Sequence, residues 1–99
     1  MPDYIYYVYI ITNKTGNVLY IGVTYDLPRR LIAHEQVYAS EFTNKYKVNH
    51  LVYYEVSESK EAALHRAEQI KQYPREKKFY LINALNPLNK DLTDTFIIN

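Results

Sequence analysis

The sequence contains no cysteine, so it offers neither a disulfide framework nor a metal site built on thiolates. It also has no tryptophan and only two glycines. No apolar run approaches the roughly 20 residues that are needed to cross a bilayer. The first residues lack the basic segment and the cleavage site of a signal peptide. We therefore expect a cytoplasmic protein that does not contact a membrane.

The length of 99 residues, with 47% hydrophobic content, is enough for one core but not for a second domain. The net charge of +1 does not by itself indicate nucleic acid, because non-specific binders are usually more basic. The charge is unevenly distributed, however, and four basic residues fall within eight positions: Lys71, Arg75, Lys77 and Lys78. On charge alone, a solvated helix face explains this run.

Apolar periodicity predicts the element order β-β-α-β-α-α. Residues 4–12 are apolar and aromatic on both alternating faces, which predicts a strand that is covered on both sides. A turn around Gly16 leads to a second, antiparallel strand. A helix is expected at 26–36, with Asp26 at its start, and a third strand at 50–56. A second helix, capped by Ser57 or Ser59, is expected to run to residue 73, and a third helix at 75–85.

We assign residues 1–92 to a single domain and residues 93–99 to a C-terminal tail. The tail is expected to pack loosely unless its apolar residues dock on the body. Those residues are Phe96, Ile97 and Ile98.

The first helix carries two unexpected residues on its packing side. At 100° steps, Leu27, Arg30, Leu31 and His34 share one arc, whereas Arg29 points towards water. An arginine on a packing arc usually has an anionic partner. The alternative is a side chain whose stem passes the core edge to a surface carboxylate. A histidine in this position is either a structural residue or a catalyst.

The second helix places Ala63, Leu64, Ala67 and Ile70 on its apolar stripe, with Glu68 at the edge beside Leu64. A carboxylate in such a position can be partly shielded from water, which suits a hard cation such as Mg²⁺. An ordinary surface glutamate is the alternative interpretation.

Taken in order, these residues match a known pattern. Tyr7-Val8-Tyr9 and Tyr20-Ile21-Gly22 resemble the paired motifs of the GIY-YIG nuclease superfamily. Arg30 lies ten residues after Tyr20, His34 lies four residues further, and Glu68 follows on a later helix. The resemblance covers residues 4–92 and is strong for the short, stand-alone bacterial members described as predicted endonucleases, which are similar to excision-repair incision domains. Further matching segments are residues 42–46, 51–55, 68–71, 75–78 and 86–87.

The resemblance implies an α+β fold with a small central three-stranded antiparallel sheet flanked by helices. It also implies an endonuclease that hydrolyses DNA phosphodiester bonds with one Mg²⁺ or Mn²⁺ ion. Glu68 would then be the sole protein ligand of the metal. Tyr9 would activate or orient the attacking water, and His34 would receive or relay its proton. Arg30 would hold the scissile phosphate, and Tyr20 would position it or a metal-bound water.

The sequence departs from the family pattern at three points. Tyr7 replaces the glycine of the first motif, and Val23 stands where excision-repair relatives have a lysine. Many relatives also place an asparagine near the metal ligand, for which three residues are candidates here: Asn83, Asn86 and Asn89.

In the light of this resemblance, the basic residues Lys71, Arg75, Lys77 and Lys78 are interpreted as part of a face that binds the DNA backbone, together with Arg29 and Lys45. Because no segment resembles a recognition helix, we expect selection of a DNA structure, such as a branch or flap, rather than of a sequence. Two alternatives are a non-catalytic nucleic-acid-binding module of the same fold and a protein-interaction domain.

Overall fold

The computed structural model describes residues 5–13, 16, 18–33 and 48–96. Its element order confirms the predicted α+β fold with a three-stranded antiparallel sheet. The elements are β1 (Tyr6–Asn13), β2 (Leu19–Thr24), a helix at residues 27–33, β3 (Val48–Ser57), α2 (Lys60–Lys71), α3 (Arg75–Leu85) and α4 (Thr93–Phe96). None of the helices in these described ranges is long and apolar enough to span a membrane.

The central strand of the sheet is β1, which pairs with β2 on one side and with β3 on the other. Tyr9 lies opposite Gly22 on β2 and opposite Tyr54 on β3. Six of the eight residues of β1 are buried, as expected for a strand covered on both sides.

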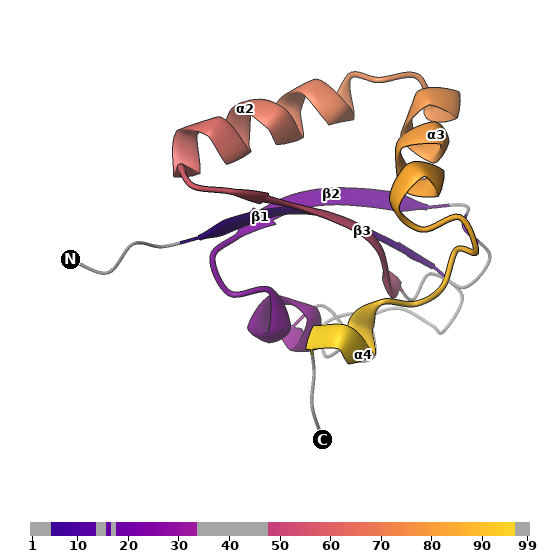
Figure 1. Ribbon diagram of the computed structural model, residues 1–99, viewed down its shortest axis with the longest axis horizontal. Helices are drawn as coiled ribbons and strands as arrows, with labels where there is room; N and C mark the ends of the chain where they lie inside the picture. Colours follow the sequence, from indigo (N-terminus) through magenta and orange to yellow (C-terminus); the bar gives the residue numbers. More distant parts are fainter. Residues whose placement is uncertain (1–4, 14–15, 17, 34–47, 97–99) are drawn as a thin grey trace.

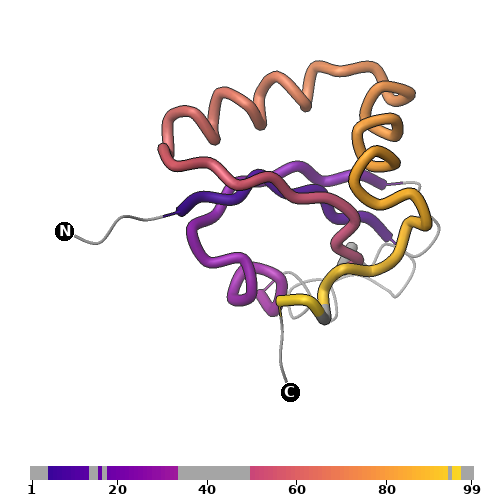
Figure 2. Tube along the Cα trace, in the orientation of Figure 1, coloured from indigo at the N-terminus to yellow at the C-terminus, as the bar shows by residue number. Residues whose placement is uncertain are grey.

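Helices cover the two faces of the sheet as separate layers (Figure 1). On one face, α2 and α3 bury their apolar residues against Val8, Ile10 and Ile21. On the other face, Tyr9 and Ile11 pack against the helix at residues 27–33. The tube in Figure 2 follows the same separation, with this helix and α4 below the sheet and α2 above it. The buried sides of α2 and of the helix at 27–33 therefore lie on opposite faces of the sheet.

The C-terminal segment docks along β3 on the lower face of the sheet. The backbone N–H of Leu92 donates to the carbonyl oxygen of Leu51 at 2.7 Å, and the Asp91 carboxylate accepts the N–H of Leu51 at 3.2 Å. The ring of Phe96 lies 4.9 Å from that of Tyr54, centroid to centroid. The sequence leaves open whether Phe96 docks on the body or packs loosely, and in the structure it docks. The domain boundary at residue 92 stays a prediction.

Candidate active site

Two tyrosines from paired strands meet on the lower face of the sheet. Tyr9 is 1% exposed, whereas Tyr20 on the edge strand β2 is 40% exposed. Their ring centroids lie 6.2 Å apart, with the ring planes tilted by 38°. Tyr20 lies directly opposite Ile11, two residues beyond Tyr9, so alternation along the strand puts both rings on one face. One ring is therefore fixed in the core while its neighbour reaches solvent.

Gly22 makes room for the buried tyrosine. A Cβ atom at this position would lie 2.5 Å from both the Cζ and the hydroxyl oxygen of Tyr9. Such a distance is impossible without movement, so the absence of a side chain lets the Tyr9 ring lie across β2. A glycine within a strand often marks this kind of close approach.

The loop after β2 sets the position of the helix at residues 27–33. Thr24 accepts the backbone N–H of Asp26 through its hydroxyl at 3.0 Å, and the Asp26 carboxylate accepts the N–H of Arg29 at 3.2 Å. This is the predicted N-cap. Leu27 and Leu31 are 0% and 3% exposed and pack in the same cluster as Tyr9, which joins the helix to the tyrosine pair.

The two arginines of this helix are both exposed. They line a surface hollow of about 290 Å³ together with Thr24, Tyr25 and Asp26. The prediction that Arg30 lies on the packing arc is therefore wrong, whereas Arg29 faces water as expected. Two leucines suffice to cover this part of the sheet, and burying a guanidinium group without an anion would be costly.

Glu68 lies on α2, a helix of the upper layer. The buried residues of α2 are Ala63, Ala67 and Ile70, which pack in the cluster of the upper face. Glu68 is exposed, and Leu64 is 49% exposed, so the prediction that Leu64 belongs to the apolar stripe is wrong. The buried stripe is narrower than predicted and leaves Glu68 outside any shielded edge.

Comparison with known proteins decides the family. Residues 5–87 match the GIY-YIG catalytic domain, a span that includes both tyrosines, both arginines and Glu68. The chain belongs to the GIY-YIG family.

Relatives of similar length support this membership. The chain is 36% identical to the UPF0213 protein SSP2268 of Staphylococcus saprophyticus over 79% of its own length and 94% of that protein. It is 38% identical to the UPF0213 protein SA0446 of Staphylococcus aureus over 78% and 93%. The solution structure of the UPF0213 protein BH0048 from Bacillus halodurans is similar, with a TM-score of 0.57 and 29% identity over 91% of this chain and 95% of that one.

Nucleases of the GIY-YIG family typically use a divalent metal ion. Among the described residues no three His, Asp or Glu side chains cluster as ligands, so Glu68 would have to hold the ion alone. On α2, Arg66 reaches Glu55 on β3, so Glu68, about 200° further round the helix, lies on the flank towards the other edge strand, β2. A single exposed carboxylate suits a hydrated Mg²⁺ ion, which binds through one or two carboxylates and keeps several waters. The assignment of Glu68 as that ligand stays a prediction.

The remaining predicted residues fall into two groups. His34 and Lys45 lie outside the described residues. The basic residues of the GIY-YIG domain on α2 and α3 lie on the upper layer, away from Arg29 and Arg30. Within that layer, the Arg75 guanidinium donates to the carbonyl oxygen of Gly16 at 3.0 Å, and the Lys77 ammonium lies 4.1 Å from the Tyr73 ring centroid. Lys71 is exposed, and Lys78 is half-buried. The single backbone-binding face that was expected is thus split between the two layers.

The three candidate asparagines have different surroundings. Asn83 is exposed on α3. Asn86 is 5% exposed and donates through its amide to the carbonyl oxygens of Val52 at 3.2 Å and Lys90 at 2.8 Å. Asn89 lines a pocket beside α3. Asn86 therefore has a structural role that the sequence does not reveal.

The upper face also has an ion pair that the sequence does not reveal. The Arg66 guanidinium donates to the Glu55 carboxylate at 2.8 Å, and the Tyr53 hydroxyl donates to the same carboxylate. Burial alone would raise the pKa of Glu55, but the hydrogen bonds from Arg66 and Tyr53 outweigh it and lower that pKa below its ordinary value. Burial and the neighbouring carboxylate raise the pKa of Tyr53. This network ties α2 to β3 and keeps both charges paired.

Proposed function

We propose that this GIY-YIG domain binds the phosphodiester backbone of DNA on the lower face of its sheet. One observation carries the proposal, namely that the half-exposed Tyr20 and the exposed Arg29 and Arg30 belong to one layer, which the buried cluster of Tyr9, Leu27 and Leu31 joins together. The planar fork of a guanidinium group matches two phosphate oxygens, and a charge-assisted bond of this kind is about twice as strong as a neutral one. An exposed tyrosine adds a hydroxyl donor and a ring on which a base can stack.

Cleavage of the bound DNA is the second candidate function, and the match to the catalytic domain of the family favours it. In this proposal Tyr9 orients the attacking water, and Tyr20 and Arg30 hold the phosphate. His34 is proposed as the proton relay. A bound Mg²⁺ or Mn²⁺ ion would polarise a phosphoryl oxygen as a Lewis acid. Glu68 is proposed as the protein ligand of that ion, and the match to the catalytic domain, which spans Glu68, supports cleavage.

Arg30→Ala is expected to weaken binding of labelled DNA about tenfold, because it removes a charge-assisted hydrogen bond worth roughly 1.5–3 kcal/mol. The slope of log K against log salt should fall by about one unit. Fluorescence anisotropy at several salt concentrations measures both quantities. Lys60→Ala removes an equally exposed charge from the upper layer and is the matched control. If the Arg30 variant and the parent bind DNA with equal affinity at every salt concentration, the proposal is wrong.

Glu68→Ala is expected to abolish metal-dependent cleavage and to leave DNA binding within about twofold of the parent, because it removes the proposed ligand of the ion but no positive charge or aromatic ring. The test is a panel of labelled duplex, single-stranded, flapped and four-way-junction DNA with Mg²⁺ or Mn²⁺. Cleavage that needs metal and disappears in this variant would establish Glu68 as the metal ligand, whereas equal cleavage by both proteins would contradict that role. Salt-sensitive binding without cleavage would leave the domain as a binding module.

A further inference from the structure

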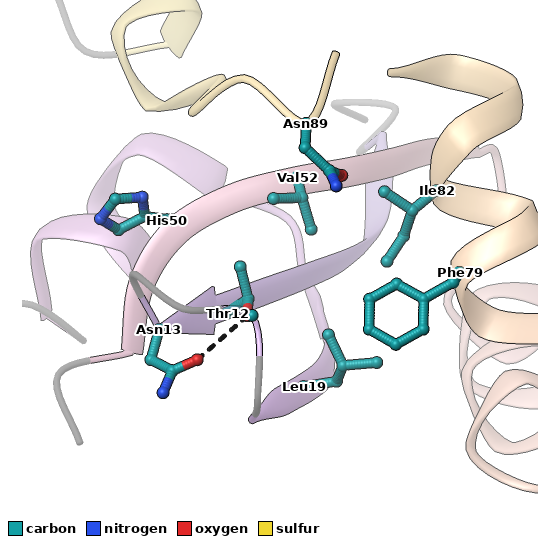
Figure 3. Close-up of a pocket in the computed structure, with 9 residues that line it drawn as sticks. Thr12, Asn13, Leu19, His50, Val52, Phe79, Ile82 and Asn89 are labelled. Atoms are coloured by element: carbon teal, nitrogen blue, oxygen red, sulfur yellow. Dashed lines mark hydrogen bonds between the residues drawn. The ribbon is translucent and has the colours of Figure 1, made fainter. Parts of the chain in front are cut away.

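A second hollow lies on the upper layer, where the sheet ends at the turn between β1 and β2 (Figure 3). It has a volume of about 120 Å³. Its apolar wall is formed by Leu19, Phe79 and Ile82, and polar side chains from three segments lie around it. Those polar residues include Asn13, His50 and Asn89. None of this belongs to the tyrosine and arginine site on the opposite face.

Asn89 offers a complete amide to this pocket. Figure 3 shows its side chain directed into the space between Val52 and Ile82. Across the described ranges its amide has no hydrogen-bonding partner, so one acceptor and two donor hydrogens are available. The backbone φ of Asn89 is 52°, a left-handed value that asparagine tolerates. The turn N–H of Asn89, which donates to the Asn86 carbonyl oxygen at 3.0 Å, fixes this position.

The size of the pocket limits what can enter. Sites for drug-sized ligands occupy roughly 300–1,000 Å³. An apolar cavity of about 150 Å³ is enough to hold a benzene ring. At about 120 Å³ the pocket is smaller than that cavity, but one side of it is open to solvent. It can therefore take one planar ring inserted part of the way, and it is too small for a two-ring system or a whole nucleotide.

A positive charge stands beside the pocket. The Arg75 guanidinium lies 5.1 Å from the centroid of the Phe79 ring and donates to the carbonyl oxygen of Gly16. Both Phe79 and Gly16 line the pocket. A ring that stacks on Phe79 would thus carry any attached phosphate group towards a cation.

From these features we propose that the pocket binds an unpaired pyrimidine base of single-stranded nucleic acid. Phe79 supplies the stacking surface, Asn89 pairs with the polar edge of the base, and Arg75 faces the adjoining phosphate. An asparagine amide is a common partner for a base edge, and stacking on an aromatic ring contributes about 1–3 kcal/mol per base. The inference deepens the proposed function, on which it rests, by naming single-stranded nucleic acid as the substrate class.

The test is titration of the ¹⁵N-labelled chain with cytidine, uridine, adenosine and ribose 5-phosphate, followed by NMR. Saturable shifts at Leu19, Phe79 and Asn89 are expected with the pyrimidine nucleosides, and adenosine should bind at least about fivefold more weakly. Asn89→Gly keeps the left-handed backbone and removes only the amide, so affinity should fall about tenfold. Asn83→Ala, which removes an exposed amide elsewhere on α3, should bind like the parent.

Two results would overturn the inference. Equal shifts with ribose 5-phosphate would identify an anion site rather than a base pocket. The second result is that nucleosides and oligothymidylate do not shift the pocket resonances, whereas DNA shifts those of Tyr20 and Arg30. This would contradict the base pocket but not the proposed function. If DNA perturbs neither face, the inference and the proposed function fall together.

Discussion

Asn86→Ala is expected to lower the free energy of unfolding by about 3 kcal/mol. The Asn86 side chain makes three hydrogen bonds: it donates to Val52 and Lys90 carbonyl oxygens and accepts the Lys90 N–H at 3.0 Å. Each bond contributes about 1 kcal/mol net, and the change would leave the buried Val52 carbonyl without this donor. For a domain of this size, the loss corresponds to a fall in Tm of at least about 10 °C.

Urea and thermal unfolding followed by circular dichroism measure this effect. Asn83→Ala lies three residues earlier on α3, is exposed, and should change stability by less than about 0.5 kcal/mol. Asn86→Asp tests the direction of the bonds, because it keeps an acceptor for Lys90 and removes both donations. A Tm for Asn86→Ala within 2 °C of the parent would show that the segment after α3 is held by other contacts.

The position of Asn86 also explains why sequence reasoning misses it. Its buried partner, Val52, lies 34 residues earlier in the chain, whereas its two bonds with Lys90 span only four residues. Nothing in the local sequence shows that Asn86, at the end of the helix, rather than Asn83 or Asn89, reaches a strand so much earlier in the chain. The Glu55–Arg66 pair is hidden for the same reason, since the register of β3 against α2 decides which side chains meet.

The fold was easier to predict than the site. A strand that is apolar on both sides must be central, and β1 is central. Asp26 and Ser59 are side-chain caps, which act over three residues and can be recognised locally. Pro74 separates α2 from α3. These are short-range constraints, so the sequence contains nearly all the information that they need.

In the site, too, short-range constraints determine some positions and not others. Tyr9, Gly22 and Tyr20 come together through a hairpin, whose short connection fixes which residues face each other. Glu68 was assigned from a helical stripe and a family spacing. A helical stripe identifies the buried side of α2 but not the face of the sheet that it covers. The structure resolves that choice by placing α2 and the tyrosine pair on opposite faces.

Gly22→Ala is expected to destabilise the domain by about 1–3 kcal/mol and to weaken DNA binding at the tyrosine pair. Glycine in a strand normally costs about 0.5–1 kcal/mol relative to alanine, so a gain in stability would be the ordinary result. Here the added Cβ meets the Tyr9 ring at 2.5 Å. Tyr9 is packed against Leu27 and Leu31, so its ring cannot swing away without disturbing the core.

A double-mutant cycle isolates this contact. In a Tyr9→Leu background the ring atoms that the new methyl group meets are gone, so Gly22→Ala should become neutral or stabilising. The coupling free energy between the two changes, measured by urea unfolding, should therefore exceed about 1 kcal/mol. If Gly22→Ala lowers the free energy of unfolding by the same amount in both backgrounds, the clash with Tyr9 is not the cause of the destabilisation. A coupling of the expected size would mean that the glycine of the second motif holds the tyrosine of the first in place, so that the two motifs act as one unit of the site.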